Sequence, residues 1–247
     1  MSILKIIELL IISFTYQQHT LRIVQHEVPV ICYHNIRPLV SGQAPDYTIS
    51  TEVFSRHIKM LHDSGYHSIT PEQLYNYLTR GDSLPSHPVL ISFDDSREEQ
   101  YSIAPPILKQ YGFKAVFFIM TVTINKPGYL TAEQIKILSD NGNCIALHTW
   151  DHPDMRKVSL EEWPLQIDQP KKLLQRITGK TVDYFAWPNG TWNEKSAGEL
   201  SRHNIKAAFQ LSGKLSGTYP LYTIRRLLVS GSWSGATLLS SIRSSFR

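Results

Sequence analysis

The sequence predicts an α/β fold in which short parallel strands alternate with helices. Short continuous apolar runs recur along the chain, and amphipathic segments with helical periodicity separate them. The 247 residues contain no internal repeat, low-complexity tract or linker rich in Pro and Gly, so we expect one large domain. This length is common for α/β barrels that do not divide into smaller domains.

Each predicted strand is a short run of mainly apolar residues, and the runs cover 28–33, 67–69, 89–93, 115–120, 144–147, 182–186, 207–210 and 224–229. Each predicted helix places apolar residues three or four positions apart, as in 51–64, 70–81, 105–111, 131–141, 159–178 and 193–203. Thr70 fits the N-cap of the second helix, with Pro71 at its first position. Pro164 and Pro170 must kink or split the fifth helix. Residues 39–50 are expected to form a loop.

Composition and charge restrict the class of protein. Hydrophobic residues make up 42% of the chain, which suffices for a packed core and excludes general disorder. The net charge is +4, but the Lys and Arg residues are scattered and form no long basic run. We therefore expect a solvated cationic surface and no nucleic-acid partner.

Cys32 and Cys144 lie in predicted strands without CxxC spacing, so we expect two small buried residues and no disulfide or metal site. Residues 1–25 include an apolar stretch that Glu8 interrupts and that is too short for a spanning helix. This segment is consistent with an export signal or anchor, an interfacial helix, or a helix packed on the domain. We place the domain itself at residues 26–247.

Polar side chains of interest follow the ends of several predicted strands. They are His34, Asp94, Asp95, His148 and the turn 187–190. Since the carboxyl ends of parallel barrel strands build one shared site, residues far apart in the sequence are expected to converge there.

Asp94 and Asp95 come directly after an apolar strand. Their mutual repulsion is costly unless a cation offsets it, and a divalent metal would do so. One Asp could bind the metal while the other faces the substrate. An N-cap or turn explains the pair equally well from the spacing alone.

His148 and His152 are four residues apart just after another strand. Two imidazoles and one carboxylate can bind one metal ion and leave a coordination position open for water, as catalytic zinc requires. The spacing alone is weak, because such pairs arise by chance, but it gains weight beside the Asp pair. We take the other His residues as surface or structural groups without partners: His19, His26, His57, His62, His67, His87 and His203.

His34 and the 187–190 turn each have a plain structural interpretation. His34 could be a buried imidazole bonded to a backbone carbonyl, or a general acid, since imidazole titrates near neutral pH. Trp187, Pro188 and Asn189 belong to a predicted tight turn; its backbone N–H groups, that of Asn189 in particular, could stabilise an oxyanion, or the segment could be a simple turn. Trp150, Trp187 and Trp192 could stack on sugar rings or belong to the core.

Together these motifs resemble the NodB-type polysaccharide deacetylases, carbohydrate esterase family four. That family carries an aspartate-pair segment, a HxxxH segment and a later turn, which are matched by 92–96, 148–152 and 185–190. A narrower resemblance is to the poly-β-1,6-N-acetylglucosamine deacetylases of bacterial biofilm exopolysaccharide. Residues 32–36 and 54–74 match that subgroup, and the similarity covers about residues 26–230.

The resemblance implies a distorted (β/α)7 barrel, the NodB-type deacetylase fold, with a metal at its centre. Asp95, His148 and His152 would bind one divalent ion, with zinc as the default and cobalt, nickel or iron as alternatives. Asp94 would be the general base. Many members take a His acid from near the C-terminus, where this chain has none; the exopolysaccharide subgroup takes it from the first strand, where His34 stands.

Three positions depart from the family pattern: Ser96 stands where Gly is usual, Ala186 where Arg is usual, and Asn189 where Tyr is usual. The Arg that normally partners the base Asp is therefore expected to be absent. If the oxyanion donor is a backbone N–H, Asn189 can still supply it, but stacking on the sugar is lost.

The expected activity is removal of N-acetyl groups from N-acetylglucosamine units of a polysaccharide, foremost poly-β-1,6-N-acetylglucosamine. Alternatives are the same chemistry on peptidoglycan or chitin-like oligomers, a metal-dependent amidohydrolase of small molecules, and an inactive glycan-binding protein. From the substrate we expect a location outside the cytoplasm, with secretion, the periplasm and the cell surface all open, peripheral association with the membrane or envelope, and a monomer.

Overall fold

The computed structural model describes residues 27–37, 47–211 and 213–246. The N-terminal segment 1–25 lies outside this part, so its predicted role as signal, anchor or peripheral helix stays a prediction. Within the described residues, no helix combines the length and apolar character that crossing a membrane requires.

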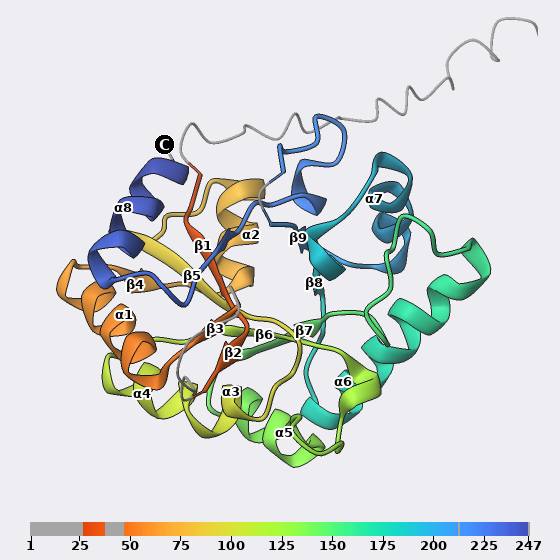
Figure 1. The fold of residues 1–247 in the computed structure, drawn as a ribbon. Coiled ribbons are helices and arrows are strands. Elements are labelled where there is room, and N and C mark those ends of the chain that lie inside the picture. Colours follow the sequence, from red (N-terminus) through yellow and green to blue (C-terminus); the bar gives the residue numbers. More distant parts are fainter. Residues whose placement is uncertain (1–26, 38–46, 212, 247) are drawn as a thin grey trace, which may run out of the picture.

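A curled parallel sheet forms the centre of the molecule (Figure 1). Seven strands follow one another in the order β10-β1-β5-β6-β7-β8-β9, and β4 pairs with β5 outside this path. Their bounds are β1 Val30–Tyr33, β4 His67–Ser68, β5 Pro88–Phe93, β6 Val116–Ile119, β7 Cys144–Leu147, β8 Tyr184–Ala186, β9 Ala207–Phe209 and β10 Leu227–Leu228. All these pairings are parallel.

The segment 224–228 connects the two sides of the curled sheet. Ile224 forms a parallel bridge with Phe209 of β9, and Leu227 pairs with Ile31 of β1. The sheet therefore curls back on itself across a short stretch of chain. The predicted α/β fold is confirmed, in the form of a curled parallel sheet.

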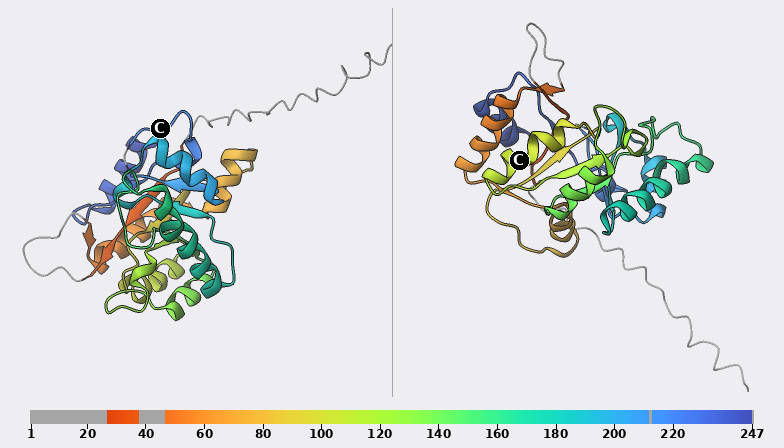
Figure 2. Two further views of the ribbon diagram at one scale, coloured as in Figure 1. Left: turned by 90° about the vertical axis from the view of Figure 1, so that its right-hand side faces the viewer. Right: turned by 90° about the horizontal axis from the view of Figure 1, so that it is seen from below.

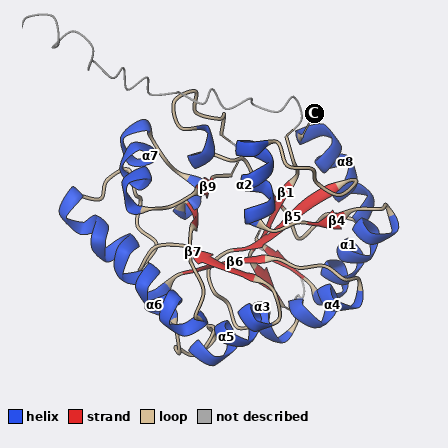
Figure 3. Ribbon diagram, turned by 180° about the vertical axis from the view of Figure 1, so that it is seen from behind, coloured by secondary structure: helices blue, strands red, loops and turns tan. Residues whose placement is uncertain are grey.

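Helices cover the outside of the sheet, as two further views show (Figure 2). Their bounds are α1 Thr51–Asp63, α2 Pro71–Arg80, α3 Glu99–Ser102, α4 Ala104–Gln110, α5 Ala132–Asp140, α6 Gln169–Thr178, α7 Glu194–Leu200 and α8 Gly235–Ser245. Thr70 caps α2 through a reciprocal capping box with Gln73, as predicted, and Gly81 ends it with a left-handed φ of 76°. Seen from behind, the strands lie inside a ring of helices (Figure 3).

The prolines divide one predicted helix as expected, and two other features differ from the sequence prediction. The predicted helix 159–178 is divided into a 3₁₀ turn, Leu160–Glu162, a π-helical turn, Pro164–Asp168, and α6. This division follows from the prolines, which remove backbone donors. The C-terminal helix α8 was not predicted, and it packs beside α1. Part of the predicted loop 39–50 is a strand: β3 Thr48–Ile49 pairs with β2 Asn35–Ile36.

The strands alternate their side chains between two hydrophobic clusters. Val30, Leu90 and Phe118 belong to one cluster inside the curl, whereas Ile31 and Ile91 belong to the larger cluster beneath the helices. Because successive side chains of a strand point to opposite faces, the period of two continues past each strand end. Residues 34, 94 and 148 therefore lie on the interior face of the curled sheet. Both cysteines are free, as predicted, and Cys32 is buried, but Cys144 is half-buried where burial was predicted.

Candidate functional site

A cavity of about 210 Å³ opens where the strands end. The residues around it come from six separate segments of the chain: His34, Asn35, Tyr47, Asp94, Asp95, His148, His152, Asn189, Gly190 and Leu211. The expected convergence of His34, Asp94, Asp95, His148, His152 and Asn189 is therefore observed. Asn35, Tyr47 and Leu211 were not singled out from the sequence, because their positions give no chemical signal without the fold, whereas Gly190 belongs to the predicted turn 187–190.

Asp95, His148 and His152 offer three ligand atoms that all lie within 4.8 Å of one another. The Oδ1 atom of Asp95 is 3.5 Å from Nε2 of His148 and 3.7 Å from Nε2 of His152. Two ligand atoms that share a tetrahedral zinc ion at about 2.1 Å are roughly 3.4 Å apart. This donor set of one oxygen and two nitrogens thus fits a single divalent cation.

A second contact orients the ring of His148. Its Nδ1 atom lies 2.8 Å from the backbone carbonyl of Ala186, so Nδ1 carries the proton and donates it. The tautomer leaves the lone pair of Nε2 free to face Asp95. Ala186 and the strand β8 therefore fix the direction of a prospective metal ligand, although the side chain of Ala186 has no polar atom.

Several site residues adopt left-handed backbone conformations that L-residues avoid. Positive φ values occur at Asp95 (74°), Ser96 (60°), Thr149 (67°), His152 (68°) and Asn189 (55°). Such conformations cost of order 1–3 kcal/mol each and are retained where surrounding structure imposes them. The turns after β5, β7 and β8 thus hold their side chains in place by strained geometry rather than by regular secondary structure.

Asp94 is almost fully buried, with 2% of its surface exposed, and it forms a bidentate ion pair with Arg226. Nη1 and Nη2 of Arg226 each lie 2.7 Å from one carboxylate oxygen. Burial by itself would raise the pKa of Asp94, but the Arg226 guanidinium, His148 and His34 together outweigh it. The pKa of Asp94 is consequently held well below its ordinary value, and the carboxylate is ionised at neutral pH.

Arg226 is also buried and has three further contacts. Its Nε donates to the carbonyl of Gln210 at 2.9 Å, Nη1 lies 3.4 Å from Oγ of Ser92, and the guanidinium lies over Phe118 at 5.2 Å. The expectation that Asp94 lacks an Arg partner is therefore wrong, because Arg226 supplies the guanidinium from another segment. An Arg within an apolar run that enters the barrel was the signal available in the sequence.

His34 follows β1 on the interior face and lies near Asp94. Its Nε2 is 3.9 Å from Oδ2 of Asp94, and its Nδ1 is 3.8 Å from Sγ of Cys32. Burial lowers the pKa of His34, and the carboxylates of Asp94 and Asp95 oppose this only in part. A lowered pKa makes the protonated imidazole a stronger acid, as proton delivery to a departing group requires.

Gln100, on α3, is a further residue that the sequence analysis missed. Its side-chain amide donates to two backbone carbonyls, that of His34 at 2.8 Å and that of Asp94. Gln100 is fully buried. One side chain thereby ties the end of β1 to the end of β5 and fixes the two polar residues relative to each other.

The structure accommodates all three departures from the family pattern. Ser96 occupies a left-handed position, where Gly is favoured, and its Oγ accepts a hydrogen bond from the N–H of Met120 at 2.8 Å. Asn189 is also left-handed, a conformation that Asn tolerates better than most residues. Ala186 needs no guanidinium, since Arg226 provides it.

The tryptophans predicted near the substrate lie elsewhere. Trp187 is fully buried, and its Nε1 donates to the carbonyl of Tyr222 at 2.8 Å, so it belongs to the core and cannot stack on a sugar. Pro188 is buried beside it. Trp150 and Trp192 are half-buried and do not line the cavity. The substrate-contact predictions for Trp187 and Pro188 are corrected accordingly, and those for Trp150 and Trp192 gain no support.

Some of the remaining histidines do have partners, contrary to expectation. His57 is buried, with Nε2 2.8 Å from the carbonyl of Trp233 and Nδ1 3.3 Å from the hydroxyl of Tyr33. His203 pairs with Asp168 at 2.9 Å. His57 therefore has a structural role in joining β1, α1 and the C-terminal segment.

Known proteins resemble this chain over most of its length. A family profile described as polysaccharide deacetylase matches residues 81–208. YxkH of Bacillus subtilis (strain 168), named as a candidate polysaccharide deacetylase, is 31% identical over 221 residues, which cover 88% of this chain and 77% of that protein. A poly-beta-1,6-N-acetyl-D-glucosamine N-deacetylase of Staphylococcus aureus (strain MRSA252) is 25% identical over 205 residues, which cover 77% of this chain and 70% of that protein.

Solved structures share the fold. The Streptococcus pyogenes deacetylase PplD in complex with acetate is 25% identical and has a TM-score of 0.81, with 87% of this chain and 98% of that chain covered. The structure of IcaB from Ammonifex degensii is 25% identical and has a TM-score of 0.74, with 88% and 97% covered.

Proposed function

Since this chain belongs to the polysaccharide deacetylase family and is a hydrolase acting on amide bonds, we propose that it removes N-acetyl groups from poly-β-1,6-N-acetylglucosamine. One observation carries the chemistry: a three-ligand cluster, an ionised buried Asp94 and the imidazole of His34 all face one small cavity. A metal-dependent amide hydrolase needs a site for a cation, a base and an acid within reach of one acyl group, and this cavity offers all three.

We assign Asp95, His148 and His152 as the ligands of one divalent cation, foremost zinc. The fit rests on the donor set and on Ala186, which frees Nε2 of His148. When bound, such a cation lowers the pKa of a coordinated water and polarises the acyl oxygen. Cobalt, nickel and iron accept the same ligands.

Asp94 serves as the base that accepts a proton from the attacking water. Arg226 occupies one hydrogen-bonding direction of each carboxylate oxygen, and each oxygen keeps further lone-pair capacity for a proton. Because the pair keeps Asp94 ionised, the group is always ready to accept.

His34 donates a proton to the departing amine nitrogen, which would otherwise leave as a very unfavourable amide anion. Nε2 of His34 and Nε2 of His148 each lie 3.9 Å from Oδ2 of Asp94. The proposed acid, the proposed base and the ligand cluster are therefore close enough to act on one acyl group. The backbone N–H of Asn189, which lines the cavity, is the proposed oxyanion donor.

The polymer itself is proposed on two grounds. The acid is placed on the first strand, as the resemblance to the exopolysaccharide subgroup implies. In addition, the Staphylococcus aureus relative named above as a poly-beta-1,6-N-acetyl-D-glucosamine N-deacetylase shares 25% identity over 205 residues. Since such a polymer lies outside the cell, we further propose an extracytoplasmic location, peripheral association with the envelope, and action as a monomer.

Acetate release from defined oligomers tests the proposal. The metal content of the purified protein is measured first, and equal concentrations of β-1,6- and β-1,4-linked N-acetylglucosamine oligomers are then compared. We expect chelator-sensitive release that is faster with the β-1,6 linkage. Faster release from β-1,4 oligomers would assign peptidoglycan or chitin-like substrates instead. A purified protein that contains no metal and gains no activity from added metal would contradict the ligand assignment.

A further inference from the structure

The cavity contains two nonpolar side chains among the described residues that line it, Tyr47 and Leu211. Leu211 lies against Gly190, where a Cβ atom would approach its Cγ to 2.7 Å. Tyr47 lies instead beside His34, with ring centroids 5.4 Å apart and planes tilted by 45°. One nonpolar group therefore lies near the proposed oxyanion donor, and the other lies near the proposed acid.

The backbone holds Tyr47 in this position. The N–H of Asn35 donates to the carbonyl of Tyr47 at 3.0 Å, and the N–H of Arg37 donates to that of Ile49 at the same distance. These bonds join β2 to β3, and β2 begins directly after His34. The location of the Tyr47 ring is thus set by the same stretch of chain that carries the acid.

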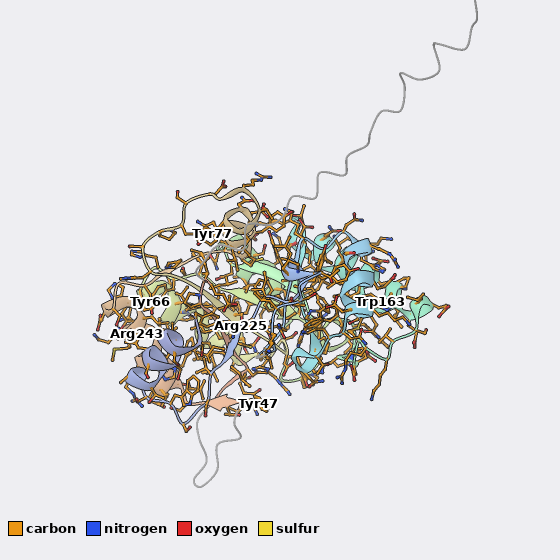
Figure 4. All side chains as sticks on the ribbon, turned by 90° about the horizontal axis from the view of Figure 1, so that it is seen from above. Tyr47, Tyr66, Tyr77, Trp163, Arg225 and Arg243 are labelled. Atoms are coloured by element: carbon orange, nitrogen blue, oxygen red, sulfur yellow. The ribbon has the colours of Figure 1, made fainter. Side chains whose placement is uncertain are left out.

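The Tyr47 side chain is unusual in its exposure. It is 50% exposed, and Leu160 at 51% is the other large hydrophobic residue that the described chain leaves open to this degree. Figure 4 shows Tyr47 at the margin of the molecule, close to the strand β3. An exposed aromatic ring at the mouth of a polar cavity gains by covering its free face with a ligand.

The chemistry of the departing group places a sugar beside this ring. The amine nitrogen that His34 protonates must come within about 2.6–3.2 Å of the imidazole. That nitrogen is bonded directly to the pyranose ring, so the sugar lies next to His34. Aromatic contacts operate at centroid separations of about 4.5–7 Å, and Tyr47 is within that range of the His34 ring.

We propose that Tyr47 is a specificity-determining residue that packs against a pyranose ring of the substrate, either the reacting hexosamine or its neighbour in the polymer. Its ring provides an apolar surface for the C–H face of the sugar, which the tryptophans predicted for this purpose do not provide. The inference rests on the proposed function, because it assumes that the acyl group is carried by a sugar.

Kinetics on two substrates test this role. Tyr47→Ala, Tyr47→Phe and the control Leu160→Ala are compared on a β-1,6-linked N-acetylglucosamine oligomer and on an aryl acetate, which carries the acyl group without a sugar. Tyr47→Ala removes the contact between the aromatic ring and the sugar, so we expect KM for the oligomer to rise about tenfold. Tyr47→Phe and Leu160→Ala should retain the wild-type KM, and activity on the aryl acetate should be unchanged in all variants.

Binding provides a readout that does not depend on turnover. In an Asp94→Asn background, adding Tyr47→Ala should weaken calorimetric binding of the oligomer about tenfold. If wild-type protein fails to release acetate while this loss of binding remains, the proposed function fails and the role of Tyr47 stands. An unchanged KM and Kd for the oligomer, or an equal loss of kcat on both substrates, would overturn the role of Tyr47 as a sugar contact.

Discussion

The ion pair between Arg226 and Asp94 gives the sharpest test of the site, because both groups are buried. Replacing Arg226 by Met keeps much of the side-chain volume but leaves the Asp94 carboxylate buried and without its cation. Removing one partner of a buried pair costs about 3–5 kcal/mol of folding free energy. A domain has only about 5–15 kcal/mol of net stability, so we expect Arg226→Met to fold but with a much lower denaturation midpoint.

The double variant separates charge from packing. Asp94→Asn combined with Arg226→Met removes both charges, so it should be less destabilised than the sum of the two single variants. A favourable coupling of about 1–3 kcal/mol is expected from the double-mutant cycle. The measurement is urea denaturation of all four proteins in the same buffer.

The coupling should depend on pH with a definite sign. Arg226 lowers the pKa of folded Asp94 below its unfolded value, which is about 3.9. Such a carboxylate contributes stability that is fully present above the unfolded value and is lost as pH falls towards the folded one. The difference in unfolding free energy between wild type and Arg226→Met should therefore be largest at neutral pH and become smaller below about pH 4.

Arg226→Lys extends the test to catalysis. Lys keeps the positive charge but cannot reproduce two parallel hydrogen bonds, so Asp94 should stay ionised yet lose its fixed orientation. Misplacement of a base by about 1 Å costs on the order of a hundredfold in rate, and we expect a fall in kcat of this size with an unchanged metal content. Arg226→Met with wild-type stability and kcat would refute the reasoning, because it would show that neither fold nor chemistry needs the pair.

Three further predictions concern the other parts of the site. Asp95→Asn and His152→Ala should each lower the bound metal by about 10-fold or more, as measured by elemental analysis after dialysis, and a full complement of metal would contradict the ligand assignment. His34→Gln should lower kcat by about 10²–10⁴-fold and abolish the fall in kcat at high pH, while the metal content, measured as the control, stays the same. An unchanged pH profile of kcat would leave His34 with a structural role only. Gln100→Met keeps the size of the side chain but removes both donors to the ends of β1 and β5, so kcat should fall about tenfold or more while metal binding persists, whereas a change in stability alone would exclude positioning.

The sequence predicted well where the strands end. Apolar runs such as 89–93 are buried on both faces, and a parallel strand of this kind has a strong compositional signal. Helix starts were also readable where a side chain caps the backbone, as at Thr70 and Thr131. α8 was missed, since its few buried residues give weaker periodicity.

The sequence by itself determined which residues follow a strand, and the period of two put His34, Asp94 and His148 on one face of the sheet. Its motif order was enough to indicate the family and the three proposed metal ligands. These are properties of local chain geometry, which neighbouring residues fix without help from the rest of the fold.

Only the tertiary structure decided which distant groups complete the site. Arg226 reaches Asp94 across 132 positions of sequence, and Tyr47 reaches the cavity through the β2–β3 pairing. Whether a Trp side chain faces solvent or the core likewise depends on tertiary packing, and the Trp187 side chain lies in the core. Such contacts depend on how the sheet curls and closes, and no short stretch of sequence encodes that closure.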